Sequence, residues 1–173
     1  GNLKLRSGEA QAADEFSRTE GGFSRFNFDV NHVSKLSKVT QFYIFAHGQL
    51  AKRNLDSSEQ FYLGGADAGR AYPQGEAGGD SGYQATAELR YQTPVKGMSM
   101  TLFADVGEVL ARKDGDTSDP HRRLAGWGIG AVYSLDRSLY ARLDYARKIK
   151  GESYRSEAED KNGRLWFRLY KLF

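Results

Sequence analysis

An alternation of apolar and polar residues runs through most of this 173-residue chain and constrains its fold more than any other feature. In residues 83–91, apolar or aromatic residues occupy every second position, and polar residues fill the positions between. Successive side chains of a β-strand point to opposite faces, so this pattern predicts strands with one apolar and one polar face. Similar stretches occur at residues 25–30, 40–50, 98–107, 123–133, 138–148 and 164–173, with a short stub at Asn2–Arg6. The pattern predicts an all-β, antiparallel chain of about seven or eight strands.

The connections between these stretches alternate in length. Tight links at about 33–38, 93–97 and 134–137 interleave with long polar segments at about 7–21, 51–82, 109–122 and 149–163. Short turns at one end and long loops at the other are typical of an antiparallel transmembrane β-barrel of the outer membrane. Aromatic residues near the strand ends fit the girdles of such a barrel: Tyr83, Tyr91, Tyr133, Tyr145 and Phe173. A soluble up-and-down barrel or sandwich stays open as the alternative, because the alternation does not say which face is inside.

Composition excludes several classes of protein. The net charge is +3, and no basic block is longer than two residues, which is too dilute for a nucleic-acid surface. The chain has no cysteine, so disulfides and thiolate metal sites are excluded, but no compartment is selected. No stretch of 18 apolar residues exists, so a transmembrane helix is not expected. The first residue is Gly1, and we interpret the chain as a piece of a longer one.

The sequence offers little to an enzyme or a metal. Residues 79–82 read GDSG, as around a protease nucleophile, but only 33 residues separate His47 from Ser81, too few for such a fold. The three histidines have no paired ligand spacing, and the acidic run at 114–119 lacks the closing glutamate of a calcium loop. We therefore expect no catalysis, no metal and no cofactor. We interpret Gly78, Gly79 and Gly82 as the descent of a loop into a strand that begins at Tyr83, with Asp80 and Ser81 forming the turn.

Four motifs, in order along the chain, resemble a known family. Residues 61–65 (FYLGG), 69–73 (GRAYP), 79–83 (GDSGY) and 88–90 (ELR) are similar to the C-terminal barrel of two-partner secretion transporters, the TpsB family. These outer-membrane exporters of haemolysins, adhesins and contact-dependent inhibition toxins belong to one superfamily with the barrel-assembly insertase. The resemblance covers the chain from about residue 60 to Phe173 and implies a protein-translocation pore in the outer membrane of a Gram-negative cell.

Two superfamily signatures imply a specific contact. The (V/I)RG(F/Y) signature of the long sixth loop maps onto residues 69–72, and the F-x-D-x-G strand signature maps onto residues 103–107. In the family the loop arginine pairs with the strand aspartate inside the lumen. The resemblance thus implies a loop-lumen latch of Arg70, Tyr72, Phe103, Asp105 and Gly107. It also implies supporting lumen and motif residues, namely Gly69, Gly79, Asp80, Gly82, Glu88 and Arg90. The alternative is a solvated loop arginine and an ordinary lumen aspartate.

Ala71 stands where the superfamily signature has glycine, and Gly69 where it has an aliphatic residue. Alanine at that place is common in the secretion branch, so the departure favours an exporter over the insertase. A passive porin-like barrel is the further alternative.

The resemblance also implies the extent of the domain. The family barrel has sixteen strands, so residues 1–173 are expected to be its C-terminal half, with 51–82 as the sixth extracellular loop folding into the lumen. The N-terminal strands, the POTRA domains and the plug helix have no counterpart here. The expected partners are a secreted passenger, outer-membrane lipid and, through Phe173 as assembly signal, the barrel-assembly machinery.

Overall fold

Seven long antiparallel strands form the main sheet of the protein. The structure, a computed structural model, describes residues 1–4, 7, 9, 14, 18–111, 121–136, 138–149 and 162–172. The sheet order is β11-β10-β9-β8-β7-β4-β3, so β3 and β11 are its edge strands. The strands are β3 (Arg25–Lys35), β4 (Thr40–Ala51), β7 (Ser81–Gln92), β8 (Met98–Leu110), β9 (His121–Ser134), β10 (Leu139–Lys148) and β11 (Gly163–Lys171). The prediction of an all-β antiparallel fold is confirmed, and the seven longer predicted stretches overlap these seven strands.

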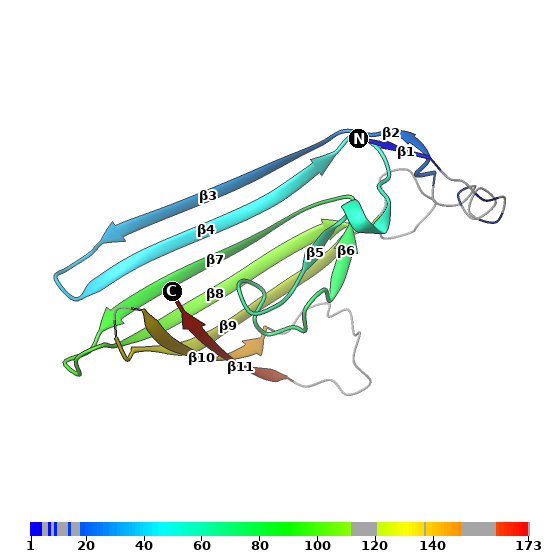
Figure 1. Ribbon diagram of the computed structural model, residues 1–173. Helices are drawn as coiled ribbons and strands as arrows, with labels where there is room; N and C mark the ends of the chain where they lie inside the picture. The colour runs from blue at the N-terminus through cyan, green and yellow to red at the C-terminus, as the bar shows by residue number, and fades with distance from the viewer. Residues whose placement is uncertain are drawn as a thin grey trace.

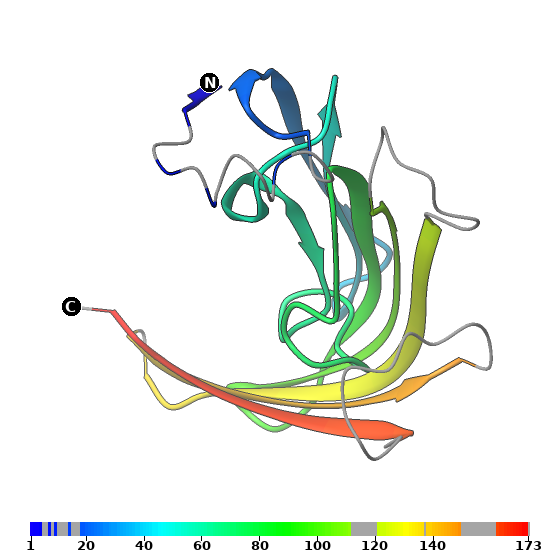
Figure 2. The ribbon, with the colours of Figure 1, turned by 90° about the vertical axis from the view of Figure 1, so that its right-hand side faces the viewer.

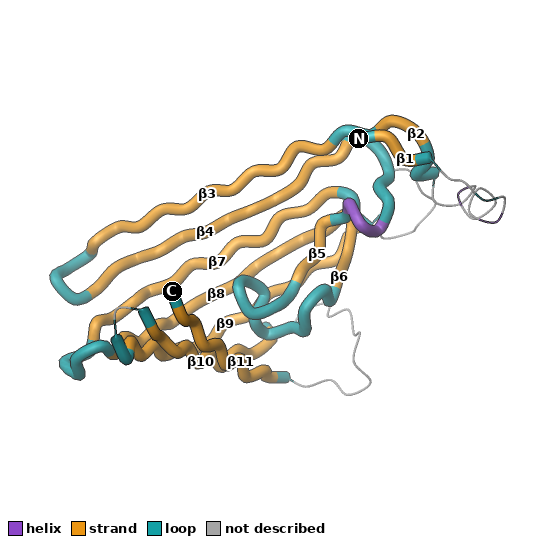
Figure 3. Tube along the Cα trace, in the orientation of Figure 1, coloured by secondary structure: helices purple, strands orange, loops and turns teal. Residues whose placement is uncertain are grey.

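The sheet is strongly curved, and a loop lies in its concave side. Seen along the strands, the sheet forms an open arc with the segment between β4 and β7 inside it (Figure 2). That segment carries a short hairpin, β5 (Phe61–Leu63) with β6 (Ala77–Gly79), and the 3₁₀ helix η1 (Ser57–Glu59) near the strand ends (Figures 1 and 3). The hydroxyl and backbone N–H of Ser58 donate to the Asp56 carboxylate and lower its pKa. A loop with its own hairpin therefore occupies the space that the sheet encloses.

The register assigns the two faces that the alternation left open. On the concave face of β7, β8 and β10, several charged residues are buried, among them Glu88, Asp105 and Asp144, together with the ring of Phe103. The opposite face of the sheet carries exposed apolar residues: Leu102 on β8 and Ile129 on β9 are about half exposed, and Phe167 on β11 is 66% exposed. The convex face is thus apolar and the concave face polar. This is the arrangement of a barrel wall between lipid and an aqueous lumen.

The connections alternate in length, as predicted, between short links and long segments. Four-residue or five-residue links join β3 to β4, β7 to β8 and β9 to β10 at one end of the sheet, and the β4–β7 loop lies at the other (Figure 1). The connections predicted at 109–122 and 149–163 fall mostly on residues outside those described. In the described part of the chain, no helix is both long and apolar enough to cross a membrane.

Three details of the sequence prediction were wrong. The first link begins later than predicted, because β3 continues to Lys35. Strand β7 begins at Ser81, not Tyr83, so Gly82 lies within the strand, and the Ser81 hydroxyl accepts a hydrogen bond from Ala51 N. The N-terminal stub pairs as β1 (Asn2–Leu3) with β2 (Gly21–Gly22) and does not join the main sheet.

Candidate functional site: the loop seat in the concave face

The tip of the β4–β7 loop makes a tight turn at Gly69. Its backbone has φ +72°, a conformation that side-chain-bearing residues rarely adopt. The Gly69 carbonyl accepts a hydrogen bond from Tyr72 N at 3.0 Å, which closes the turn. A Cβ at Gly69 would also lie 3.0 Å from the Cα of Gly64, which follows β5 on the part of the loop that leads to the tip. Glycine therefore replaces the aliphatic residue of the superfamily signature because this turn requires it.

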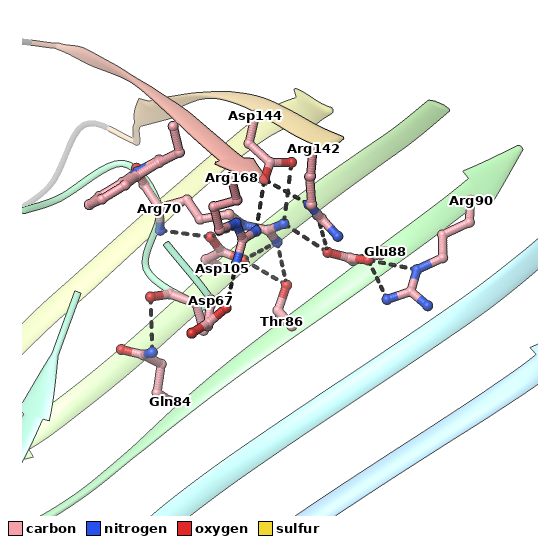
Figure 4. Close-up of polar contacts among 12 residues, drawn as sticks. Asp67, Arg70, Gln84, Thr86, Glu88, Arg90, Asp105, Arg142, Asp144 and Arg168 are labelled. Carbon is pink, nitrogen blue, oxygen red and sulfur yellow. Dashed lines mark hydrogen bonds and ion pairs between the residues drawn. The ribbon is translucent and has the colours of Figure 1, made fainter. Parts of the chain in front are cut away.

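Arg70 follows this turn and points into the polar face of the sheet (Figure 4). Its Nε donates to Asp105 Oδ2 at 3.0 Å and its Nη2 to Asp105 Oδ1 at 2.7 Å, so the two side chains form a bidentate pair. Its backbone N–H also donates to Asp105 Oδ2, at 2.9 Å. Nη1 donates to Glu88 Oε1 and Nη2 to Thr86 Oγ1, both at 2.7 Å. The structure brings the Arg70 and Asp105 side chains of the two signatures into direct contact.

The guanidinium of Arg70 is fully buried between charges and an aromatic ring. Its Cζ lies 3.4 Å from the centroid of the Phe103 ring, in the geometry of a cation–π contact. Asp105 is 1% exposed and also accepts from Thr86 Oγ1 at 2.6 Å. A buried charge is tolerated only when it is paired and hydrogen-bonded, and both conditions hold here. The solvated-arginine alternative does not describe this structure.

A second set of charges surrounds the pair. Glu88 accepts hydrogen bonds from Arg142 at 3.0 Å and from Arg90 at 2.7 Å, in addition to that from Arg70. Asp144 accepts from Arg142 at 2.7 Å and from Arg168 at 3.0 Å. Cations and carboxylates thus alternate across β7, β10 and β11 (Figure 4).

Four members of this network were missed as site residues: Thr86, Arg142, Asp144 and Arg168. Thr86, Arg142 and Asp144 occupy polar-face positions of predicted strands, so the alternation gave their face. It did not give their depth or their partners, which depend on the register between strands.

Glycines on β9 leave room for the loop and for the network. Gly126, Gly128 and Gly130 alternate along the concave face of this strand. A Cβ at Gly126 would lie 2.7 Å from the Cβ of Ala71, and one at Gly128 would overlap the Phe103 ring. One at Gly130 would overlap a carboxylate oxygen of the buried residue Asp144 on β10. The wall is therefore thin where the loop approaches it.

Tyr72 and Gly107 of the implied latch each lie at a separate contact between the loop and the wall. The Tyr72 hydroxyl donates to the carbonyl of Ala125 on β9 at 3.1 Å, and its ring is 2% exposed. A Cβ at Gly107 would lie 2.8 Å from Leu63 Cδ2, so this glycine makes room for a buried loop leucine. Gln84 holds the loop at two points before its tip, because it accepts from Gly64 N at 3.0 Å and donates to Ala68 O at 2.9 Å.

The remaining implied residues lie apart from Arg70, at the base of the loop. Asp80 is fully buried and accepts from Leu55 N at 3.0 Å and from Gln60 Nε2 at 3.1 Å, so it is a buried anchor and not a surface turn residue. Gly79 and Gly82 pack against backbone atoms of β8. Phe173 lies outside the described residues.

No candidate metal cluster forms among the described residues. These hold no cluster of three His, Cys, Asp or Glu side chains suited to a metal ion. His47 stacks on Phe45 with ring centroids 5.3 Å apart and contacts Phe61 at 5.1 Å, so it is a packing residue of the lumen wall. The acidic run at 114–119 lies outside the described part of the chain. A cavity of about 480 Å³ lies beside the network, between β4, β7 and the loop.

The concave-face residues that contact Arg70, namely Thr86, Glu88, Phe103 and Asp105, are called the loop seat. The fold and the loop seat define a class of protein. The Omp85 superfamily domain matches residues 8–169, and the chain belongs to this superfamily. It is therefore part of a β-barrel protein of the bacterial outer membrane, as predicted.

Within this class the chain is similar to two known proteins. It is 32% identical over 111 residues to the heme/hemopexin transporter protein HuxB of Haemophilus influenzae. This match covers 62% of this chain and 20% of HuxB. The structure resembles that of CdiB from Acinetobacter baumannii with a TM-score of 0.65 and 22% identity, covering 85% of this chain and 26% of CdiB. The predicted resemblance to TpsB barrels is confirmed. The chain spans about a fifth of the length of the curated relatives that it matches.

Proposed function

We propose that the protein containing this chain is an outer-membrane pore that exports one unfolded passenger protein by two-partner secretion. The observation that carries the proposal is the bidentate contact of Arg70 with Asp105, which holds the loop in the concave face. The likeness to HuxB, a named transporter, supports the same class. A polar concave face suits the passage of an extended chain, because its groups can hydrogen-bond to water or to peptide.

The proposal includes the organisation of the barrel. Residues 1–173 form the C-terminal half of a sixteen-stranded barrel, with residues 51–82 as its sixth extracellular loop. Strands β3 and β11 are edges of the main sheet, and a closed barrel pairs such edges with further strands. The partners are the passenger, outer-membrane lipid around the apolar convex face and the assembly machinery that reads Phe173.

The Arg70–Asp105 contact acts as a latch on a movable loop. While the contact holds, the loop fills part of the lumen, and a passenger needs that space. When the loop leaves, Asp105 loses three of its four hydrogen bonds, those from Arg70 N, Nε and Nη2. Water in an opened lumen would then solvate the carboxylate. The latch keeps the loop in one position until export begins, and no catalysis is involved.

The test is Arg70→Ala in the full-length protein, with secreted passenger and inserted barrel measured separately. Removing one partner of a buried ion pair destabilises the remaining arrangement by about 3–5 kcal/mol, so the loop should leave its seat. We expect passenger secretion to fall, because an unlatched loop can take other positions in the lumen through which the passenger passes, while heat-modifiable migration shows a normally inserted barrel. The control is Arg53→Ala in the same loop, because that guanidinium contacts carbonyl oxygens of Gly22 and Arg18 and not the seat.

Two outcomes would contradict the proposal. Normal secretion by the Arg70→Ala protein would show that the Arg70–Asp105 contact does not act as a latch. A fall in many outer-membrane proteins on depletion of the protein, and not in one passenger, would indicate a barrel-assembly insertase.

A further inference from the structure

The last strand of the sheet, β11, contacts the loop at a part of the wall separate from β7 and β8. Trp166 Nε1 donates to the main-chain carbonyl of Arg70 at 2.8 Å. Arg168, two residues further on, pairs with Asp67 of the same loop and with Asp144 of β10, the latter at 3.0 Å. The residues that alternate with these two, Leu165, Phe167 and Leu169, are exposed on the convex face. Trp166 and Arg168 therefore belong to the concave face of β11.

Arg70 is thus held at two places by different parts of the molecule. Its side chain is bound by Asp105, Glu88 and Thr86 on β7 and β8, and its carbonyl is bound by Trp166 on β11. In the main sheet β11 is an edge strand and has one neighbour, β10. The loop tip therefore contacts both the β7–β8 part of the sheet and this edge strand.

We propose that Trp166 and Arg168 form a second anchor that couples the seating of the loop to the position of strand β11. The side chain and the carbonyl of Arg70 belong to one residue, so a shift that breaks one set of contacts strains the other. Asp67, three residues before Arg70, extends the anchor along the loop. When the loop is seated, β11 is held from inside the lumen as well as by β10. When the loop leaves, β11 keeps its β10 pairing and loses the inner support.

The test uses a cysteine as a reporter of the loop position in the full-length protein. Ala68 lies between Asp67 and Arg70 and is 1% exposed, so a thiol at Ala68→Cys reacts with a bulky maleimide only when the loop leaves its seat. The 173 residues contain no cysteine of their own, and a matched protein without the Ala68→Cys change corrects for thiols elsewhere. Labelling is measured in the inserted protein without any passenger.

Trp166→Phe keeps an aromatic ring and removes the N–H donor. Loss of one hydrogen bond should raise the labelling rate of the reporter roughly 2- to 10-fold. Asp67→Asn removes the charge opposite Arg168 at an exposed side chain, so the barrel core is unaffected, and should raise the rate roughly 1.5- to 5-fold. The control is Trp127→Phe, because Trp127 is exposed on the convex face and should leave labelling unchanged.

Coupling is reciprocal, so the effect must also run from the loop to the strand. Arg70→Ala should raise hydrogen exchange of the β11 amides at residues 163–171, and Trp127→Phe should not. Unchanged labelling in both Trp166→Phe and Asp67→Asn, while Arg70→Ala labels fast, would overturn the second anchor. Unchanged β11 exchange in Arg70→Ala would overturn the coupling. Neither readout involves secretion, so the inference and the proposed export function fail independently.

Discussion

Asp105→Asn is the substitution that tests the loop seat most directly. Asp105 accepts hydrogen bonds from Arg70 N, Nε and Nη2 and from Thr86 Oγ1. An asparagine has one acceptor oxygen and two N–H donors in place of the second oxygen. If its oxygen takes the place of Oδ2, the bonds from Arg70 N and Nε remain. Its amide group then faces Nη2, and two donors oppose each other in a buried site.

The size of the effect follows from these contacts. One charge-assisted hydrogen bond is lost, at about 1.5–3 kcal/mol, and Arg70 loses one of the two carboxylates to which it donates. Breaking a buried ion pair outright costs about 3–5 kcal/mol. Because Glu88 still binds Nη1 at 2.7 Å, the cost here should not exceed the lower end of that range. We expect the seated loop to lose about 2–3 kcal/mol, which raises the unseated fraction roughly 30- to 140-fold.

The assay is maleimide labelling of the Ala68→Cys reporter, with heat-modifiable migration to show that the barrel is inserted. Glu108→Gln is the control, because Glu108 lies on the same strand and pairs with Arg123 at 3.3 Å and His121 at 2.7 Å, away from the loop tip. It should change labelling by less than about threefold, as expected for a partly exposed pair. The reasoning is refuted if Asp105→Asn labels as slowly as the parent, or if Glu108→Gln accelerates labelling to the same extent.

Three further predictions test the wall and the loop. Gly128→Ala should destabilise the barrel by about 1–3 kcal/mol in urea unfolding, because the new Cβ would overlap a carbonyl oxygen of β10. The control is Gly22→Ala, whose Cβ would meet nothing within 4 Å and should change the unfolding free energy by less than about 0.5 kcal/mol. Gln84→Ala removes two hydrogen bonds to the loop backbone and should raise labelling of the Ala68→Cys reporter roughly 5- to 50-fold. Leu102→Arg on the convex face should lower the free energy of unfolding from lipid vesicles by about 2–4 kcal/mol, and unchanged stability would show that this face does not contact hydrocarbon.

The strands and their faces could be predicted because both depend on local pattern. Thr86, Glu88 and Asp105 all occupy polar positions of alternating segments, and the structure has them on the concave face. A strand pattern has no information on which residue of the next strand lies opposite. Arg168 and Asp144 are 24 residues apart and meet only because β10 and β11 pair in one particular register.

The interior of the loop could not be predicted for a different reason. The pattern of residues 51–82 is polar and rich in glycine, which indicates exposure to water. In the structure Asp80 is fully buried, and two hydrogen bonds to its carboxylate come from Gln60 and Leu55, 20 and 25 positions earlier in the chain. Composition indicates exposure only when a loop lies on the outside of a domain. A loop inside a polar lumen has the same composition and the opposite burial.

That inversion also decides between the two folds that the alternation left open. In a soluble barrel or sandwich the apolar set would be the core, and charged side chains would face water. Here Phe167 is 66% exposed, whereas Arg70 and Asp144 are 0% exposed and Asp105 is 1% exposed. Exposing such a broad apolar face to water is unfavourable, and burying several charges is unfavourable unless they pair. Both free-energy costs are removed together only when hydrocarbon covers the convex face and Arg70 of the entering loop pairs with the buried carboxylates of the concave face. The loop is therefore part of what makes this wall stable, and the identity of residue 70 matters to the strands as much as to the loop.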